Sequence, residues 1–130
     1  MSTIITSTDA ERISQDILYK NDEVLSATII DMQGKILASH SKEFFKKEFG
    51  AIANEDKFYG AFLSISVLKL TNEIKHIVDE SQAIISIHKN CKMMLVPMQS
   101  HQIVVALVLQ PSVNAENFLA ADKIERFLFR

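Results

Sequence analysis

Several features are scarce or missing in this chain of 130 residues. A single cysteine, Cys91, excludes an internal disulfide framework and is compatible with a reducing compartment. The longest apolar run, residues 103–109, is far too short to span a bilayer, and the first residues show no signal-peptide pattern. Fourteen basic side chains against sixteen acidic ones argue against a nucleic-acid or anionic-membrane partner. We therefore expect a soluble, cytoplasmic protein without membrane insertion.

Residues that interrupt helices and strands are equally scarce. There are three glycines and two prolines, no Pro/Gly-rich linker, and no internal repeat. An apolar content of 48% is enough to bury a core. We expect one domain over residues 1–130, with residues 1–7 as a flexible N-terminus.

The N-terminal half predicts a helix followed by a hairpin. Thr8 and Glu11 fit a capping box at the start of a helix, and Ala10, Ile13 and Ile17 form its apolar stripe. Residues 25–29 then alternate between apolar and polar, as in a half-buried strand. A turn at residues 31–34, with a glycine able to adopt positive φ, leads into a second strand at 35–39.

The middle of the chain predicts a long helix over residues 55–79, after an atypical connecting segment at 41–54. One stripe of this helix is apolar along its length and should face the sheet. The opposite side of its first half is also apolar, through Phe58, Ala61, Phe62, Ile65 and Leu68. That side needs a second partner, either segment 41–54 or another subunit.

Three further strands are predicted at residues 83–88, 92–98 and 102–110. Residues 103–109 have no polar face, so we expect a central strand that is covered on both sides. Pro97 should lie at a strand end or bulge. Asn114 can cap a last helix, whose inner stripe would be Ala121, Ile124 and Leu128.

The resulting fold class is an α/β (α+β) sandwich around a five-stranded antiparallel sheet. Its element order is helix, strand, strand, long helix, three strands and helix, with the long helix on one face and the terminal helices on the other.

No constellation predicts catalysis or a cofactor. His88 and Cys91 flank one turn, but residues 92–98 separate them from His101 by roughly 24 Å of strand, and two ligands do not close a zinc site. No glycine-rich phosphate loop or dinucleotide fingerprint is present. We expect neither an enzyme nor a bound metal.

Two segments resemble the roadblock family, the dynein light-chain-like domains of the roadblock/longin group, whose fold is also profilin-like. SATIIDMQGKILAS, at residues 26–39, is similar to the first hairpin of the family. KMMLVPMQSHQIVVALVLQPSVN, at residues 92–114, is similar to its last two strands and the start of its final helix. The resemblance spans about residues 8–129. The chain departs from it in the longer segment 41–54 and in Val78–Ser81, where the family has glycines.

The resemblance implies a non-catalytic interaction module that scaffolds or regulates a small Ras-like GTPase. Such domains form homodimers, or heterodimers with a homologous chain, by joining sheets through the third strand and packing their long helices together. The interface residues implied here are Phe58, Phe62, Ile65, Leu68, Ile85 and Ile87. The alternative is a PAS- or GAF-like sensor domain with a small ligand between sheet and helix, which the first hairpin would also suit.

Overall fold

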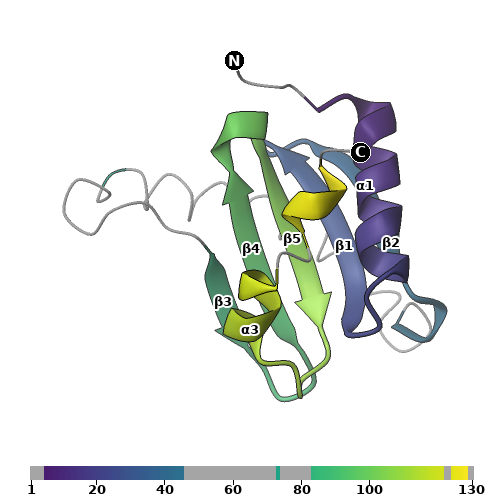
Figure 1. Ribbon diagram of the computed structural model, residues 1–130, viewed down its shortest axis with the longest axis vertical. Coiled ribbons are helices and arrows are strands. Elements are labelled where there is room, and N and C mark those ends of the chain that lie inside the picture. Colours follow the sequence, from purple (N-terminus) through teal and green to yellow (C-terminus); the bar gives the residue numbers. More distant parts are fainter. Residues whose placement is uncertain (1–4, 46–72, 74–82, 122–123, 129–130) are drawn as a thin grey trace.

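The computed structural model describes residues 5–45, 73, 83–121 and 124–128, and it has an α+β fold on a five-stranded antiparallel sheet (Figure 1). The strand order is β2-β1-β5-β4-β3. The strands are β1 (Val24–Asp31), β2 (Ile36–Ser41), β3 (Ile84–Ile87), β4 (Lys92–Met98) and β5 (Ile103–Leu109). The α-helices are α1 (Ser7–Tyr19) and α3 (Ala115–Ala120), and the 3₁₀ turns are η1 (Gln99–His101) and η2 (Glu125–Phe127). The predicted fold class is confirmed. The long helix predicted at 55–79 lies outside the described residues, apart from Glu73, which is helical.

The centre of the sheet is the apolar strand β5, as predicted. It pairs antiparallel with β1 on one side and β4 on the other. Its alternate residues from Ile103 to Leu109 join a core with α1, α3 and the C-terminal segment, all on one face (Figure 1). On the other face Val104 is buried with Ile30.

Helix α1 begins two residues before the predicted start. The cap is Thr6 rather than Thr8: the Thr6 hydroxyl accepts from the Asp9 amide at 3.1 Å and donates to the Asp9 carboxylate at 2.9 Å. The side chain before the cap, Ile5, is buried in the core, although the sequence predicts a flexible segment there. Burial of Ile5 sets where the chain enters the helix, so the cap falls on the next residue. The stripe that includes Ile13 is buried, as predicted.

The C-terminal region differs from the single helix that the sequence predicts. Asn114 caps α3 as expected, through its side-chain oxygen and the Asn117 amide at 2.9 Å. The helix ends at Ala120, however, and η2 follows. Ile124 and Leu128 are buried as predicted, but Ala121 is exposed. The tighter turn η2 places Phe127 between the two buried residues, where it completes the core.

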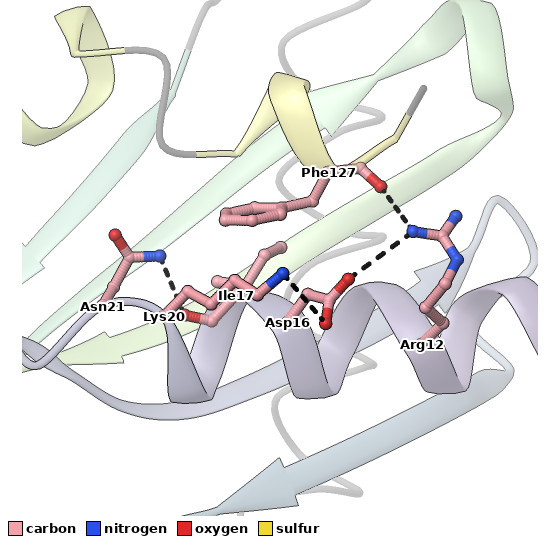
Figure 2. Close-up of polar contacts among 6 residues, drawn as sticks. All are labelled: Arg12, Asp16, Ile17, Lys20, Asn21 and Phe127. Carbon is pink, nitrogen blue, oxygen red and sulfur yellow. Dashed lines mark hydrogen bonds and ion pairs between the residues drawn. The ribbon is translucent and has the colours of Figure 1, made fainter. Parts of the chain in front are cut away.

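Polar contacts hold this C-terminal turn against α1 (Figure 2). Arg12 Nη1 donates to the carbonyl oxygen of Phe127 at 3.0 Å and lies 3.7 Å from Asp16. Asp16 also lies 3.8 Å from Lys20, whose ammonium is 5.8 Å from the centre of the Phe127 ring. Because these ion pairs are partly exposed, we expect the burial of the Phe127 ring to contribute more to stability than the charges do.

The β3–β4 hairpin shows which backbone groups of β3 point outward. The His88 amide donates to the Cys91 carbonyl at 2.9 Å, next to the turn. Because bonded and non-bonded pairs alternate in an antiparallel ladder, Ser86 also bonds to β4, opposite Met93. The amides and carbonyls of Ile85 and Ile87 therefore point away from β4.

The same alternation accounts for Pro97 in β4. Pro97 lies opposite Val104 of β5. It follows Leu95, the last β4 residue that pairs with β3, by two residues. Its nitrogen is directed to the β3 side, so the missing N–H removes no bond to β5. Pro97 thus lies near a strand end, as predicted.

The corrected cap predicts a difference between two threonines. Thr6→Ala should lower the free energy of unfolding by about 1 kcal/mol, because it removes the cap of α1. Thr8→Ala is the matched control and should change stability little, because alanine suits a helical position. Urea denaturation of both variants measures the difference. Equal effects, or a larger loss at Thr8, would contradict the observed cap.

The backbone orientation of β3 predicts a second difference. Ser86→Pro should destabilise the protein by roughly 1 kcal/mol more than Ile87→Pro, because only the former removes a ladder hydrogen bond to β4. Urea denaturation at low protein concentration checks this prediction. Equal destabilisation by the two prolines would show that the outward direction of the Ile87 amide is wrong.

Candidate protein-interaction edge

The strand β3 forms one edge of the described sheet and carries exposed isoleucines. The side chain of Ile87 is 74% exposed and that of Ile85 is 37% exposed. Strand edges present unpaired N–H and C=O groups and are usually protected by charge, proline or cover. Residues 84–87 contain no charged side chain and no proline. This edge therefore combines outward backbone groups with exposed apolar side chains.

The two isoleucines lie on the face of the sheet that carries α1 and α3. Ile85 is opposite Met94, which is part of that core, and Ile87 is opposite Lys92. The ammonium of Lys92 donates to the carbonyl of Val113, just before α3. The apolar surface of the core thus continues past β4 to the sheet edge, where it reaches solvent.

Among the described residues, the opposite edge, β2, is more fully covered than β3. Every side chain of β2 is buried or half-buried. His40 of β2 lies 2.6 Å from the Glu11 carboxylate on α1, which packs along this edge (Figure 1). Just past the strand, the Lys42 ammonium donates to the carbonyls of Asn21 and Asp22, both at 3.0 Å. Within the described sheet, the more exposed edge is therefore β3.

The other half of the predicted interface is not described. Phe58, Phe62, Ile65 and Leu68 lie outside the described residues, so their role stays a prediction. Ile85 and Ile87 are exposed at the sheet edge.

A polar pair occupies the opposite face of β3. The hydroxyl of Ser86 lies 2.6 Å from Nε2 of His88, and both side chains are exposed. The sequence carries a signal for this pair, because a spacing of two residues in a strand places both side chains on one face.

The described part of the chain holds no metal-binding cluster of three or more His, Cys, Asp or Glu residues. His101 is buried at the far end of β4 from the turn between His88 and Cys91. Among the helices of the described ranges, none is long and apolar enough to cross a membrane.

Solved structures of other proteins share this architecture, although the sequence comparisons found no match. No protein-family model and no curated protein matches the sequence. A solved structure described as MglB with a tetrameric arrangement is similar, with a TM-score of 0.71, 14% identity, and coverage of 98% of this chain and 93% of that one.

Two further solved structures agree. The Roadblock/LC7 domain from Streptomyces avermitilis has a TM-score of 0.66 at 8% identity, covering 89% of this chain and 88% of that one. MglB from Myxococcus xanthus has a TM-score of 0.63 at 10% identity, covering 94% of this chain and 84% of that one. At these identities the likeness shows the fold, and the chain has the roadblock-family fold.

Proposed function

We propose that this chain is a non-catalytic protein-interaction module, a homodimeric roadblock-like scaffold or regulator of a small Ras-like GTPase. The observation that carries the proposal is the edge strand β3, with its outward backbone groups and its exposed Ile85 and Ile87. Pairing with another strand would satisfy the backbone groups and cover both side chains.

Self-association is supported by one of the similar structures, which is described as MglB with a tetrameric arrangement. A closed dimer with a twofold axis is the commonest form of homo-oligomer. Joining two β3 edges would extend the sheet across both subunits and leave neither edge open.

The four residues of β3 are too few to form a stable interface by themselves, because specific interfaces bury about 800 Å² on each partner. The apolar helix surface of Phe58, Phe62, Ile65 and Leu68 is proposed to supply the remaining contact. Because the long helix is predicted on the face of the sheet opposite Ile85 and Ile87, the two surfaces would flank the β3 edge, and both would contact the second copy or a homologous chain.

The proposed link to a GTPase rests on two points: the sequence has no nucleotide-binding motif of its own, and it resembles the roadblock family. The sequence contains no glycine-rich phosphate loop, so nucleotide binding would belong to the partner. The sensor alternative is not favoured, because the similar structures are roadblock and MglB proteins. A cytoplasmic location stays a prediction.

The homodimer proposal is tested by one substitution and its matched control. Ile85→Asp should convert the dimer into a folded monomer, because it places a carboxylate in the joined sheet. Tyr19→Asp also replaces an exposed, large apolar side chain, but on α1, and should leave the dimer intact. Native mass spectrometry gives the mass, and circular dichroism confirms folding. A dimer that persists in Ile85→Asp would refute edge pairing, and a monomeric wild type would refute the homodimer.

The GTPase proposal is tested by binding. Immobilised protein should retain a small Ras-like GTPase in a nucleotide-dependent manner, comparing GDP with a non-hydrolysable GTP analogue. Ile85→Asp should weaken this retention if the dimer is the binding unit. If no member of a broad panel of small GTPases binds in either nucleotide state, the regulator role is wrong, whatever the oligomeric state.

A further inference from the structure

We propose that β3 pairs with β3 of a second copy in one specific register, in which a twofold axis passes at Ser86 and Ile85 of each copy lies opposite Ile87 of the other. This inference rests on the proposed homodimer and goes further, because it states which atoms meet. It follows from the outward backbone groups, the side-chain pattern of residues 84–88 and the polar pairing elsewhere in this sheet.

Backbone geometry restricts the choice of register. A twofold axis perpendicular to the joined sheet pairs the strand antiparallel with itself. Residues exchange hydrogen bonds only where outward-facing groups oppose outward-facing groups, and in β3 these belong to Ile85 and Ile87. For Ile85 or Ile87 to bond to either of these two residues in the other copy, the axis must pass at Ile85, Ser86 or Ile87.

The Ser86 register matches the side chains best on the apolar face. Each copy of Ile87, the more exposed isoleucine, would pack against Ile85 of the other copy, and symmetry makes this contact twice. Both of these pairs are hydrogen-bonded pairs, so each exchanges two backbone bonds. Residues 84–87 carry no charge, so self-pairing brings no like charges together within the strand.

The other registers leave the isoleucines poorly matched. With the axis at Ile85, Ile87 would face only the small side chain of Ala83. With the axis at Ile87, Ile85 would face Lys89, which lies in the turn beyond the strand. In both cases the two copies of one isoleucine meet at the axis, but the other isoleucine gains little apolar contact.

The side chains on the polar face of β3 support the same register, by analogy with the β1–β2 pair at the opposite edge of the sheet. There, β1 and β2 place hydroxyl residues opposite each other: Ser41 donates to Ser26 at 2.9 Å, and Thr28 lies 2.8 Å from Ser39. The Ser86 register would set two Ser86 hydroxyls opposite each other on this same face. Cross-strand hydroxyl pairs of this kind stabilise antiparallel sheets.

A cysteine scan across the strand tests the register. In the Ser86 register the two copies of residue 86 form a non-hydrogen-bonded pair with Cα atoms about 4.5 Å apart, inside the range for a disulfide. The two copies of residue 85, or of residue 87, are diagonal neighbours at roughly 7–8 Å, outside that range. A cysteine at position 86 alone should therefore cross-link readily.

The experiment uses the full chain in a Cys91→Ser background, so that each variant has one thiol. Ser86→Cys, Ile85→Cys and Ile87→Cys are oxidised with copper–phenanthroline and separated on non-reducing gels. Gln33→Cys, in the exposed β1–β2 turn, measures random collision. Thermal unfolding of each reduced variant confirms that it folds. We expect Ser86→Cys to form a covalent dimer about tenfold faster than the other three.

The possible outcomes distinguish an error in the register from an error in the proposed pairing of β3 with its own copy. Fastest cross-linking at Ile85→Cys or Ile87→Cys would overturn the Ser86 register while leaving dimerisation through β3 intact. Cross-linking of all three strand variants no faster than Gln33→Cys would overturn both, because β3 would then not meet its own copy. Fast cross-linking at Ser86→Cys, with a disulfide-linked dimer of native thermal stability, supports both.

Discussion

The fold depends on one central strand whose residues are all buried or half-buried. Each residue of β5, from Ile103 to Leu109, is apolar, so both faces of this strand must be covered and both edges must be paired. The hairpin β1–β2 satisfies one edge and the hairpin β3–β4 satisfies the other, which places β5 at the centre of the sheet. The N-terminal helix and the C-terminal segment then meet over one face, although they lie at opposite ends of the sequence (Figure 1).

The helix that covers this face protects the two edge strands of the sheet unequally. Helix α1 packs along β1 and β2, and contacts such as that between Glu11 and His40 tie it to the β2 edge. The C-terminal turn is drawn towards the same helix by Arg12 and the buried ring of Phe127 (Figure 2). The C-terminal turn η2 is thus held at α1, whereas the isoleucines of β3 at the far edge of the sheet are exposed.

The roadblock fold by itself leaves the function open, because one fold can support unrelated activities. The proposal of an interaction module therefore rests on the chemistry of the β3 edge: outward amides and carbonyls, uncharged residues and a hydroxyl flanked by two isoleucines. An edge of this composition is suited to a partner strand of the same composition. The specificity of a scaffold built in this way would come from register and side-chain matching.

Local patterns in the sequence determined the strands, the glycine turn after Asp31 and the Asn114 cap, because alternation and capping depend on neighbours within a few residues. They also identified β5 as central. Only the tertiary structure decided that Thr6 rather than Thr8 caps α1, since Ile5 is drawn into the core. It likewise ended the last helix at Ala120 and placed η2 after it, where Phe127 joins the core, and it determined which isoleucines of β3 stay exposed. Burial is set by residues distant in sequence, which no local spacing can encode.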